Sequence, residues 1–246
     1  MNDTSRTFLL IADISGFTRF MRQKSISLNH AKQIVVRLLK AVMSASSSPL
    51  KVAELEGDAV FFYSVFRGSD AKTIATIKDQ MLRLFAAFER ERASIESLTT
   101  CSCDACVRVT ELKLKQVAHV GDVVIETIGR FEKLFGIDVI LVHRLLKNSV
   151  QAKEYVMMTR PVYESIGDFF ELSPERRTEL YEGVGEVETL VFYPGALLQQ
   201  QSEGLSSVSR VQFLEKLGWR GELSLKFLLD FAGIRRIRGV FHSLSR

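Results

Sequence analysis

Two aspartates stand at positions where a folded chain can bring carboxylates together. Asp13 ends an apolar, strand-forming run at residues 7–13, and Asp58 lies in the Gly57-Asp58 turn between two further strand-like segments. In a sheet whose first strand lies beside that hairpin, the two carboxylates converge and suit Mg²⁺ or Mn²⁺, because hard cations prefer oxygen ligands. The alternative is that Asp13 caps a following helix and Asp58 is a turn residue only. Spacing alone leaves both interpretations open.

Two glutamates precede Asp58 at alternating positions. Glu54, Glu56 and Asp58 share one face of a strand if no bulge intervenes. Their carboxylates then either reinforce a cation site near Asp13 or form the solvated face of a strand.

All three cysteines lie in one short stretch, as Cys101, Cys103 and Cys106. An odd number of cysteines in a chain without a secretory signal argues against a disulfide framework. The C-x-C-x-x-C spacing suits Zn²⁺, with His119 as a conceivable fourth ligand. Reduced surface thiols in a loop and a redox sensor are the alternatives.

The elements that must position these residues follow from apolar periodicity and turn signals. Strands are expected at residues 7–13, 50–56, 59–65, 112–119, 122–128 and 154–159, with a closing hairpin over 178–193. Helices are expected at residues 29–44, 70–97 and 138–147. Asn29 is the expected N-cap of the first helix, and the second hairpin is expected to turn at Gly121-Asp122. This order predicts an α+β, ferredoxin-like fold with a largely antiparallel sheet and helices packed on it.

The basic character of the chain, whose net charge is +4, belongs to its C-terminal segment. Residues 205–246 hold eight Lys or Arg and three Asp or Glu side chains. We expect a main domain over 1–198 with a cysteine loop at 98–111, a linker at 199–210 and a basic amphipathic tail at 211–246. The tail suits an anionic membrane surface or a protein partner, or it packs on its own domain or dimer mate. Nucleic acid is not an expected partner, because the main domain shows no basic face.

Composition favours an ordinary globular protein. The apolar fraction is 46 % and the charged fraction 25 %, and no apolar run is long enough to cross a membrane. The apolar stretch near the N-terminus is too short for a secretory signal. A cytoplasmic location is therefore expected.

Five short motifs, in order along the chain, resemble those of class III adenylyl and guanylyl cyclases. They are ADISGFTRF (12–20), ELEGDAVFFY (54–63), VAHVGDVV (117–124), LFGIDVILVHRLL (134–146) and GVGEVETLVFY (183–193). The resemblance runs from residue 7 to about residue 195. It implies the nucleotidyl cyclase fold, a homodimer with sites across its interface, a nucleotide ligand, and Mg²⁺ or Mn²⁺ as cofactor.

The resemblance also assigns roles to individual residues. It places Asp13, Ile14 and Asp58 at the metal positions, where two ions activate the ribose hydroxyl and neutralise the triphosphate. It places Arg144 at the catalytic arginine, which stabilises charge that develops in the transition state. These positions keep the residues of the family.

Other positions depart from the family pattern. Glu54 stands where a lysine reads the base, and Lys133 stands near the position of its acidic or polar partner. Ile140 replaces an asparagine that positions the ribose, and Val184 replaces a lysine that contacts phosphate. Losing one transition-state donor lowers the rate by roughly 10²–10³, so ordinary cyclase activity is not expected. Whether Glu54 and Lys133 form a charge-swapped pair that reads another base stays open.

The segment His-Arg-Leu-Leu-Lys-Asn at residues 143–148 also resembles a bacterial family of cyclase-like proteins of unknown function. Three hypotheses follow. The chain is a metal- and nucleotide-binding signalling or regulatory module, an active phosphorus–oxygen lyase with an altered substrate, or a metal or redox sensor that acts through its cysteine loop.

Overall fold

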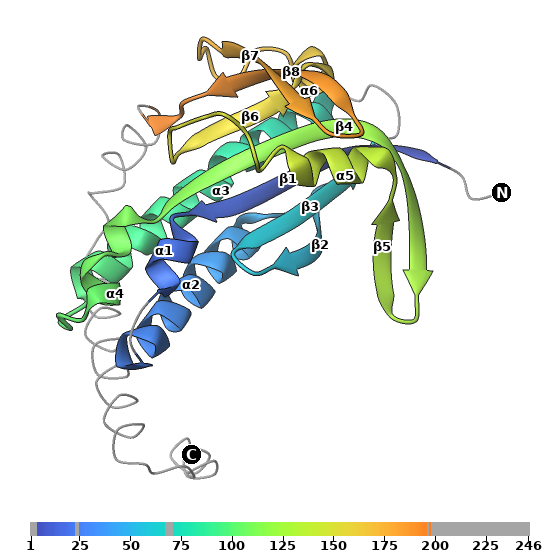
Figure 1. Ribbon diagram of the computed structural model, residues 1–246. Coiled ribbons are helices and arrows are strands. Elements are labelled where there is room, and N and C mark those ends of the chain that lie inside the picture. Colours follow the sequence, from blue (N-terminus) through green and yellow to red (C-terminus); the bar gives the residue numbers. More distant parts are fainter. Residues whose placement is uncertain (1–3, 23–24, 67–70, 196, 198–246) are drawn as a thin grey trace, which may run out of the picture. The chain divides into compact units, whose positions relative to one another are not determined.

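An eight-stranded, mostly antiparallel sheet organises the fold (Figure 1). The computed structural model describes residues 4–22, 25–66, 71–195 and 197. The strands are β1 (Ser5–Ser15), β2 (Lys51–Glu56), β3 (Ala59–Val65), β4 (Lys113–Ile128), β5 (Phe131–Phe135), β6 (Tyr155–Thr159), β7 (Glu175–Tyr181) and β8 (Gly185–Phe192). The helices are α1 (Phe17–Met21), α2 (Ser25–Ala45), α3 (Ala71–Leu98), α4 (Asp104–Val107), the 3₁₀ turn η1 (Val109–Glu111), α5 (Ile137–Arg144) and α6 (Arg160–Ile166).

The strand order is β2-β3-β1-β4-β6-β8-β7, and β5 pairs with β4 beyond the main sheet. Within the described residues, every strand pairing is antiparallel except that of β4 with β6. The predicted α+β class with a largely antiparallel sheet is therefore confirmed. The far end of β4 and its partner β5 form a hairpin that projects from the sheet (Figure 1).

The long helices α2 and α3 cover one face of the sheet and bury the larger core. Each presents an apolar stripe at helical spacing, which is why a helix forms there and why it packs. The buried residues of the two stripes are Ile34, Val35, Leu38 and Val42, then Ile77, Met81, Leu84, Phe85 and Phe88. They meet alternate residues of β1 that face the helices, including Phe8 and Leu10.

The opposite face of the sheet carries α5 and a smaller apolar cluster. Leu9 and Ile11 of β1 point to this face, and Leu141, Val142 and Leu145 of the α5 segment pack over it. Because successive strand residues alternate between faces, Asp13 belongs to this same face. The candidate chemistry therefore lies on the side of α5.

Most of the predicted elements are confirmed within a few residues, but the predicted hairpin turn at Gly121-Asp122 is wrong. The structure has one continuous strand, β4, through Gly121, and the chain turns instead after Gly129, whose φ is +64°. Gly121 pairs with Thr7 of β1, and a Cβ there would lie 2.1 Å from Cγ of Asp138. This glycine is needed for a close approach of α5 to β4 and does not mark a turn.

Two smaller expectations also differ from the structure. Asn29 lies inside α2, which begins at Ser25, so it is not the N-cap. The elements α1, α4, η1, β5 and α6 were not predicted, and α4 and η1 lie in the segment expected to be a loop. The turn at Gly57-Asp58, where Gly57 has a φ of +65°, and the closing hairpin of β7 and β8 are confirmed.

The predicted linker at 199–210 and the predicted tail at 211–246 lie outside the described residues. The expected membrane or protein partner of the tail therefore stays a prediction. No helix within the described ranges is long and apolar enough to cross a membrane.

The contact between Gly121 and Asp138 gives a stability test. Gly121→Ala should lower the free energy of unfolding by about 1–3 kcal/mol, because the new methyl group displaces Asp138 and the start of α5. Urea denaturation measures this change. Gly195→Ala is the matched control, since its Cβ would meet Glu154 at an ordinary 3.5 Å. Equal stability of the two variants would contradict the close-approach explanation.

Candidate metal and nucleotide site

The pairing of β1 with β3 brings Asp13 next to the turn that carries Asp58. Asp13 lies opposite Ala59, the first residue of β3. The next residue, Ile14, donates its backbone N–H to the Asp58 carbonyl at 3.1 Å. This bond fixes the turn against the end of β1. The role of Ile14 as a metal ligand stays a prediction, and its side chain is buried in the larger core.

The Asp13 carboxylate is close enough to Asp58 to perturb it. The pKa of Asp58 is raised from 3.8 to about 6. Burial is the largest cause of this rise, and the negative charge of Asp13 is the second. A half-buried carboxyl beside a second carboxyl resists ionisation unless a cation supplies positive charge. The pair therefore has the electrostatic character of a cation site.

Lys115 supplies part of that positive charge and was missed in the sequence. It lies directly opposite Asp13 on β4, and its Nζ is 3.0 Å from Oδ2 of Asp13. The side chains of Asp13 and Lys115 are 14 % and 19 % exposed, so this ion pair is largely shielded from water. Two carboxylates and one ammonium leave a local charge of −1, and a divalent ion would compete with Lys115 for Asp13.

The predicted base-reading residues meet in space. Lys133 of β5 contacts Glu54 of β2, with Nζ 2.6 Å from Oε2, and both side chains are nearly half exposed. Glu56 contacts Nε2 of His143 at 2.7 Å. Glu54 and Glu56 lie opposite Phe61 and Ala59 and share a face, because the bulge in β2 precedes Glu54. Each glutamate therefore has its own cationic or histidine partner.

Arg144, Ile140 and Val184 belong to a neighbouring part of the same face. Arg144 and Ile140 line an open pocket of about 390 Å³ on α5, together with Val139, His143 and Lys147. The Nη1 atom of Arg144 would lie 3.9 Å from a Cβ on Gly183, in the β7–β8 turn that also contains Val184. Among the described residues, the ion pair of Asp13 is formed with Lys115 and not with Arg144.

The cysteines gather around a histidine that no sequence pattern singles out. Cys103 and Cys106 each lie 3.3 Å from Nδ1 of His30, which belongs to α2. His119, the conceivable fourth ligand, lies elsewhere and contacts Asp138 at 2.8 Å. Burial lowers the pKa of His119, so its ring is a packed, neutral hydrogen-bonding group.

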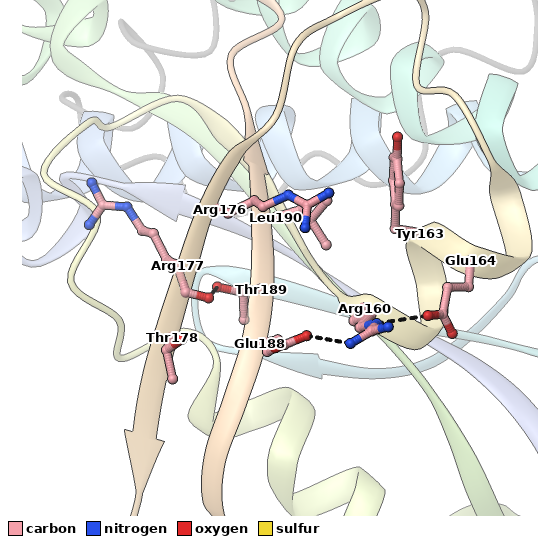
Figure 2. A pocket seen from close by; sticks show the side chains of 9 residues that line it. All are labelled: Arg160, Tyr163, Glu164, Arg176, Arg177, Thr178, Glu188, Thr189 and Leu190. Carbon is pink, nitrogen blue, oxygen red and sulfur yellow. Dashed lines mark hydrogen bonds and ion pairs between the residues drawn. The ribbon is translucent and has the colours of Figure 1, made fainter.

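A second pocket, of about 380 Å³, lies between α6, β7 and β8 (Figure 2). It contains three arginines, but Arg160 already contacts Glu164 at 2.8 Å and Glu188 at 3.0 Å. Arg177 contacts Glu175 at 2.7 Å. These ion pairs leave little positive charge to attract an anion.

A relative establishes the family. The chain is 34 % identical over 155 residues to the Uncharacterized protein Rv2561/Rv2562 of Mycobacterium tuberculosis, covering 63 % of this chain and 71 % of that protein. The chain belongs to the Rv2561/Rv2562 family. In addition, the family model described as "Protein of unknown function (DUF2652)" matches residues 35–155.

Solved structures establish the fold of this family member. The guanylyl cyclase Cya2 matches with a TM-score of 0.59 and 16 % identity, over 78 % of this chain and 93 % of that one. The adenylyl cyclase CyaB from P. aeruginosa matches with a TM-score of 0.58 and 13 % identity, over 77 % and 94 %. The guanylate cyclase domain of RhGC from Catenaria anguillulae, in complex with GTP, matches with a TM-score of 0.52 and 14 % identity, over 76 % and 96 %. The predicted cyclase fold is confirmed.

Because the pKa of Asp58 is raised, replacing its carboxyl group with a neutral one should increase folding stability by an amount that depends on pH. Between pH 3.8 and about 6 the folded state holds a proton that the unfolded state releases, so this group makes stability fall as pH rises through that window. Asp58→Asn should therefore raise the melting temperature more at pH 8 than at pH 5, measured with a chelator present.

Asp122→Asn serves as the control, because Asp122 is exposed and should change stability little at either pH. The same gain for Asp58→Asn at both pH values would contradict the electrostatic account.

Proposed function

We propose that this protein is a divergent cyclase-like regulatory module that binds a divalent cation and a nucleoside triphosphate without ordinary cyclase turnover. The observation that carries the proposal is the Asp13–Asp58 pair, in which the charge of Asp13 acts on a half-buried Asp58 carboxyl at one strand end. Mg²⁺ and Mn²⁺ take few protein carboxylates and complete their ligand sets with phosphate oxygens and water. A metal–nucleotide complex is therefore the ligand that this pair fits.

Lys115 sets the strength of cation binding in this proposal. The cation has to displace the ammonium group from Asp13, which is 3.0 Å away. A cation alone then binds weakly, whereas a nucleotide adds its own phosphate ligands and an anionic partner for the released lysine. This arrangement suits a sensor whose site closes only around the metal–nucleotide complex.

The absence of turnover is supported by two apolar replacements. Ile140 is half exposed beside Arg144, where the family pattern has a ribose-binding amide. Val184 packs against the smaller apolar cluster, where the pattern has a phosphate-binding lysine. Neither side chain can donate a hydrogen bond, so catalysis loses two polar contacts while Arg144 can still hold phosphate.

Homodimerisation belongs to the same proposal. Around the β4–β5 hairpin and α5, five large apolar side chains are roughly half exposed: Ile128, Phe131, Phe135, Ile137 and Ile140. Apolar side chains gathered at one end of a monomer favour association. We propose this surface as the place where a second copy docks, because the cyclase resemblance implies a dimer with sites across its interface.

Titration of Mn²⁺ by calorimetry tests the cation site. Asp13→Asn should abolish binding, whereas Lys115→Met should tighten it about fivefold, because removing the competing ion pair is worth about 1 kcal/mol. Lys113→Met is the matched control, since Lys113 lies on the same strand but contacts Glu89 and Glu154. Binding that survives Asp13→Asn would place the cation elsewhere and overturn the proposal.

A second candidate is an active phosphorus–oxygen lyase that accepts a different nucleotide. The Glu54–Lys133 contact of 2.6 Å favours it, because it places a carboxylate and an ammonium group together where the family pattern reads the base. A carboxylate can accept hydrogen bonds from two adjacent donors, and guanine offers such donors on its pairing edge, whereas adenine offers one amino group there.

The two candidates give different results with Mn²⁺ and nucleoside triphosphates. The regulatory proposal expects GTP to bind more tightly than ATP, Glu54→Gln to reduce that preference, and neither nucleotide to yield a cyclic product. Chromatography of the reaction mixture provides the readout. Product formation that disappears in Asp13→Asn would establish the enzyme instead.

A further inference from the structure

The three cysteines and His30 form a compact set of metal-binding atoms. The Sγ atoms of Cys103 and Cys106 each lie 3.3 Å from Nδ1 of His30. With Cys101 included, the four candidate ligand atoms all lie within 4.8 Å of one another. Zinc bonds of about 2.3 Å to sulfur and about 2.0–2.1 Å to nitrogen place tetrahedral ligand atoms about 3.4–3.8 Å apart. No edge of the cluster therefore exceeds that spacing by more than about 1.4 Å.

The fold assembles this cluster from distant segments. His30 is a buried residue of α2, 73 residues away from Cys103 in the chain. Cys101 follows α3, Cys103 stands at the N-cap of the short helix α4, and Cys106 lies within that helix. The backbone N–H of Cys103 points to Sγ of Cys101 at 3.5 Å. Such N–H contacts stabilise negative charge on a thiolate.

We infer that His30, Cys101, Cys103 and Cys106 bind a structural zinc ion. Three thiolates and one imidazole are soft and borderline ligands, which select Zn²⁺ over the oxygen-preferring Mg²⁺ and Mn²⁺ of the Asp13–Asp58 site. Four protein ligands complete the tetrahedron and leave no position for a substrate. This site is independent of the proposed nucleotide function.

The position of His30 favours a metal over a redox pair. A disulfide bond forms between two sulfur atoms and does not involve an imidazole. Here Nδ1 of His30 contacts the Sγ atoms of both Cys103 and Cys106. Cys103 and Cys106 also pack against the larger core, so the cluster is not an exposed, freely oxidised loop.

The zinc ion would fasten the segment between α3 and β4 to α2. That segment contains a four-residue helix and a three-residue 3₁₀ turn, which are too short to be stable alone. It also supports the end of β1, because a Cβ on Gly16 would lie only 3.3 Å from the Glu111 carbonyl oxygen. Zinc therefore holds the structure next to the strand end that carries Asp13.

Metal analysis of the full chain, purified without chelators, tests the inference. We expect about one zinc per chain, and cobalt substitution should give the visible absorption of tetrahedral cobalt together with a thiolate charge-transfer band. Cys106→Ser and His30→Leu should each lose the bound metal, whereas His30→Cys should retain it as a four-cysteine site. Asp13→Asn and His119→Gln should keep zinc, which separates this site from the nucleotide site.

The cobalt spectrum of the unmodified chain needs no variant to fold, so the test holds even if His30→Leu unfolds. Wild-type protein without zinc, without the cobalt bands and with three freely reacting thiols would overturn the inference. Zinc that persists in both Cys106→Ser and His30→Leu would overturn it too. A reversible disulfide among the cysteines of zinc-free protein would favour the redox sensor in its place.

Discussion

The register of β1 between β3 and β4 is the constraint on which the rest of the structure depends. It runs from Ser5 opposite Val123 to Ser15 opposite Lys113, and it buries Thr7–Ala12 and Ile14 on the two faces of the strand. The same register sets Asp13 opposite Lys115 on one side and Ala59 on the other. A slip by one residue would turn Asp13 into the apolar core under α2 and α3, so the core itself enforces the position of the carboxylate.

The Asp13–Asp58 site works against the stability of the fold that holds it. Burial and mutual repulsion disfavour the charged form of Asp58, and one lysine only partly offsets this. Groups held in unfavourable electrostatic surroundings concentrate at functional sites, because binding of a ligand relieves the strain. Lys115 is the countercharge of Asp13, and under the proposed function it would lower the affinity for a bare cation.

Much of the fold could be predicted from the sequence, because apolar periodicity and turn residues are local signals. The β2–β3 turn and the stripes of α2 and α3 are examples. Gly121 led to the wrong prediction of a hairpin turn. In sequence, a glycine required by a neighbouring helix looks the same as a glycine required by a turn. Lys115 and His30 could not be found for a related reason. A cross-strand partner and a ligand from a distant helix depend on register and packing, which no local pattern records.

Asp138 ties the start of α5 to β4 at two points. Its carboxylate contacts His119 and accepts the backbone N–H of Asp122, both at 2.8 Å, while Gly121 lets the helix sit directly on the strand. These contacts hold α5 and β4 together as one rigid unit. Arg144 lies at the end of α5, and Lys115 lies on β4. These contacts restrain where Arg144, at the end of α5, lies relative to Asp13, which pairs with Lys115 of β4. Under the proposed function, closure around a nucleotide would therefore require other parts of the chain, or a second copy, to move toward α5 and β4.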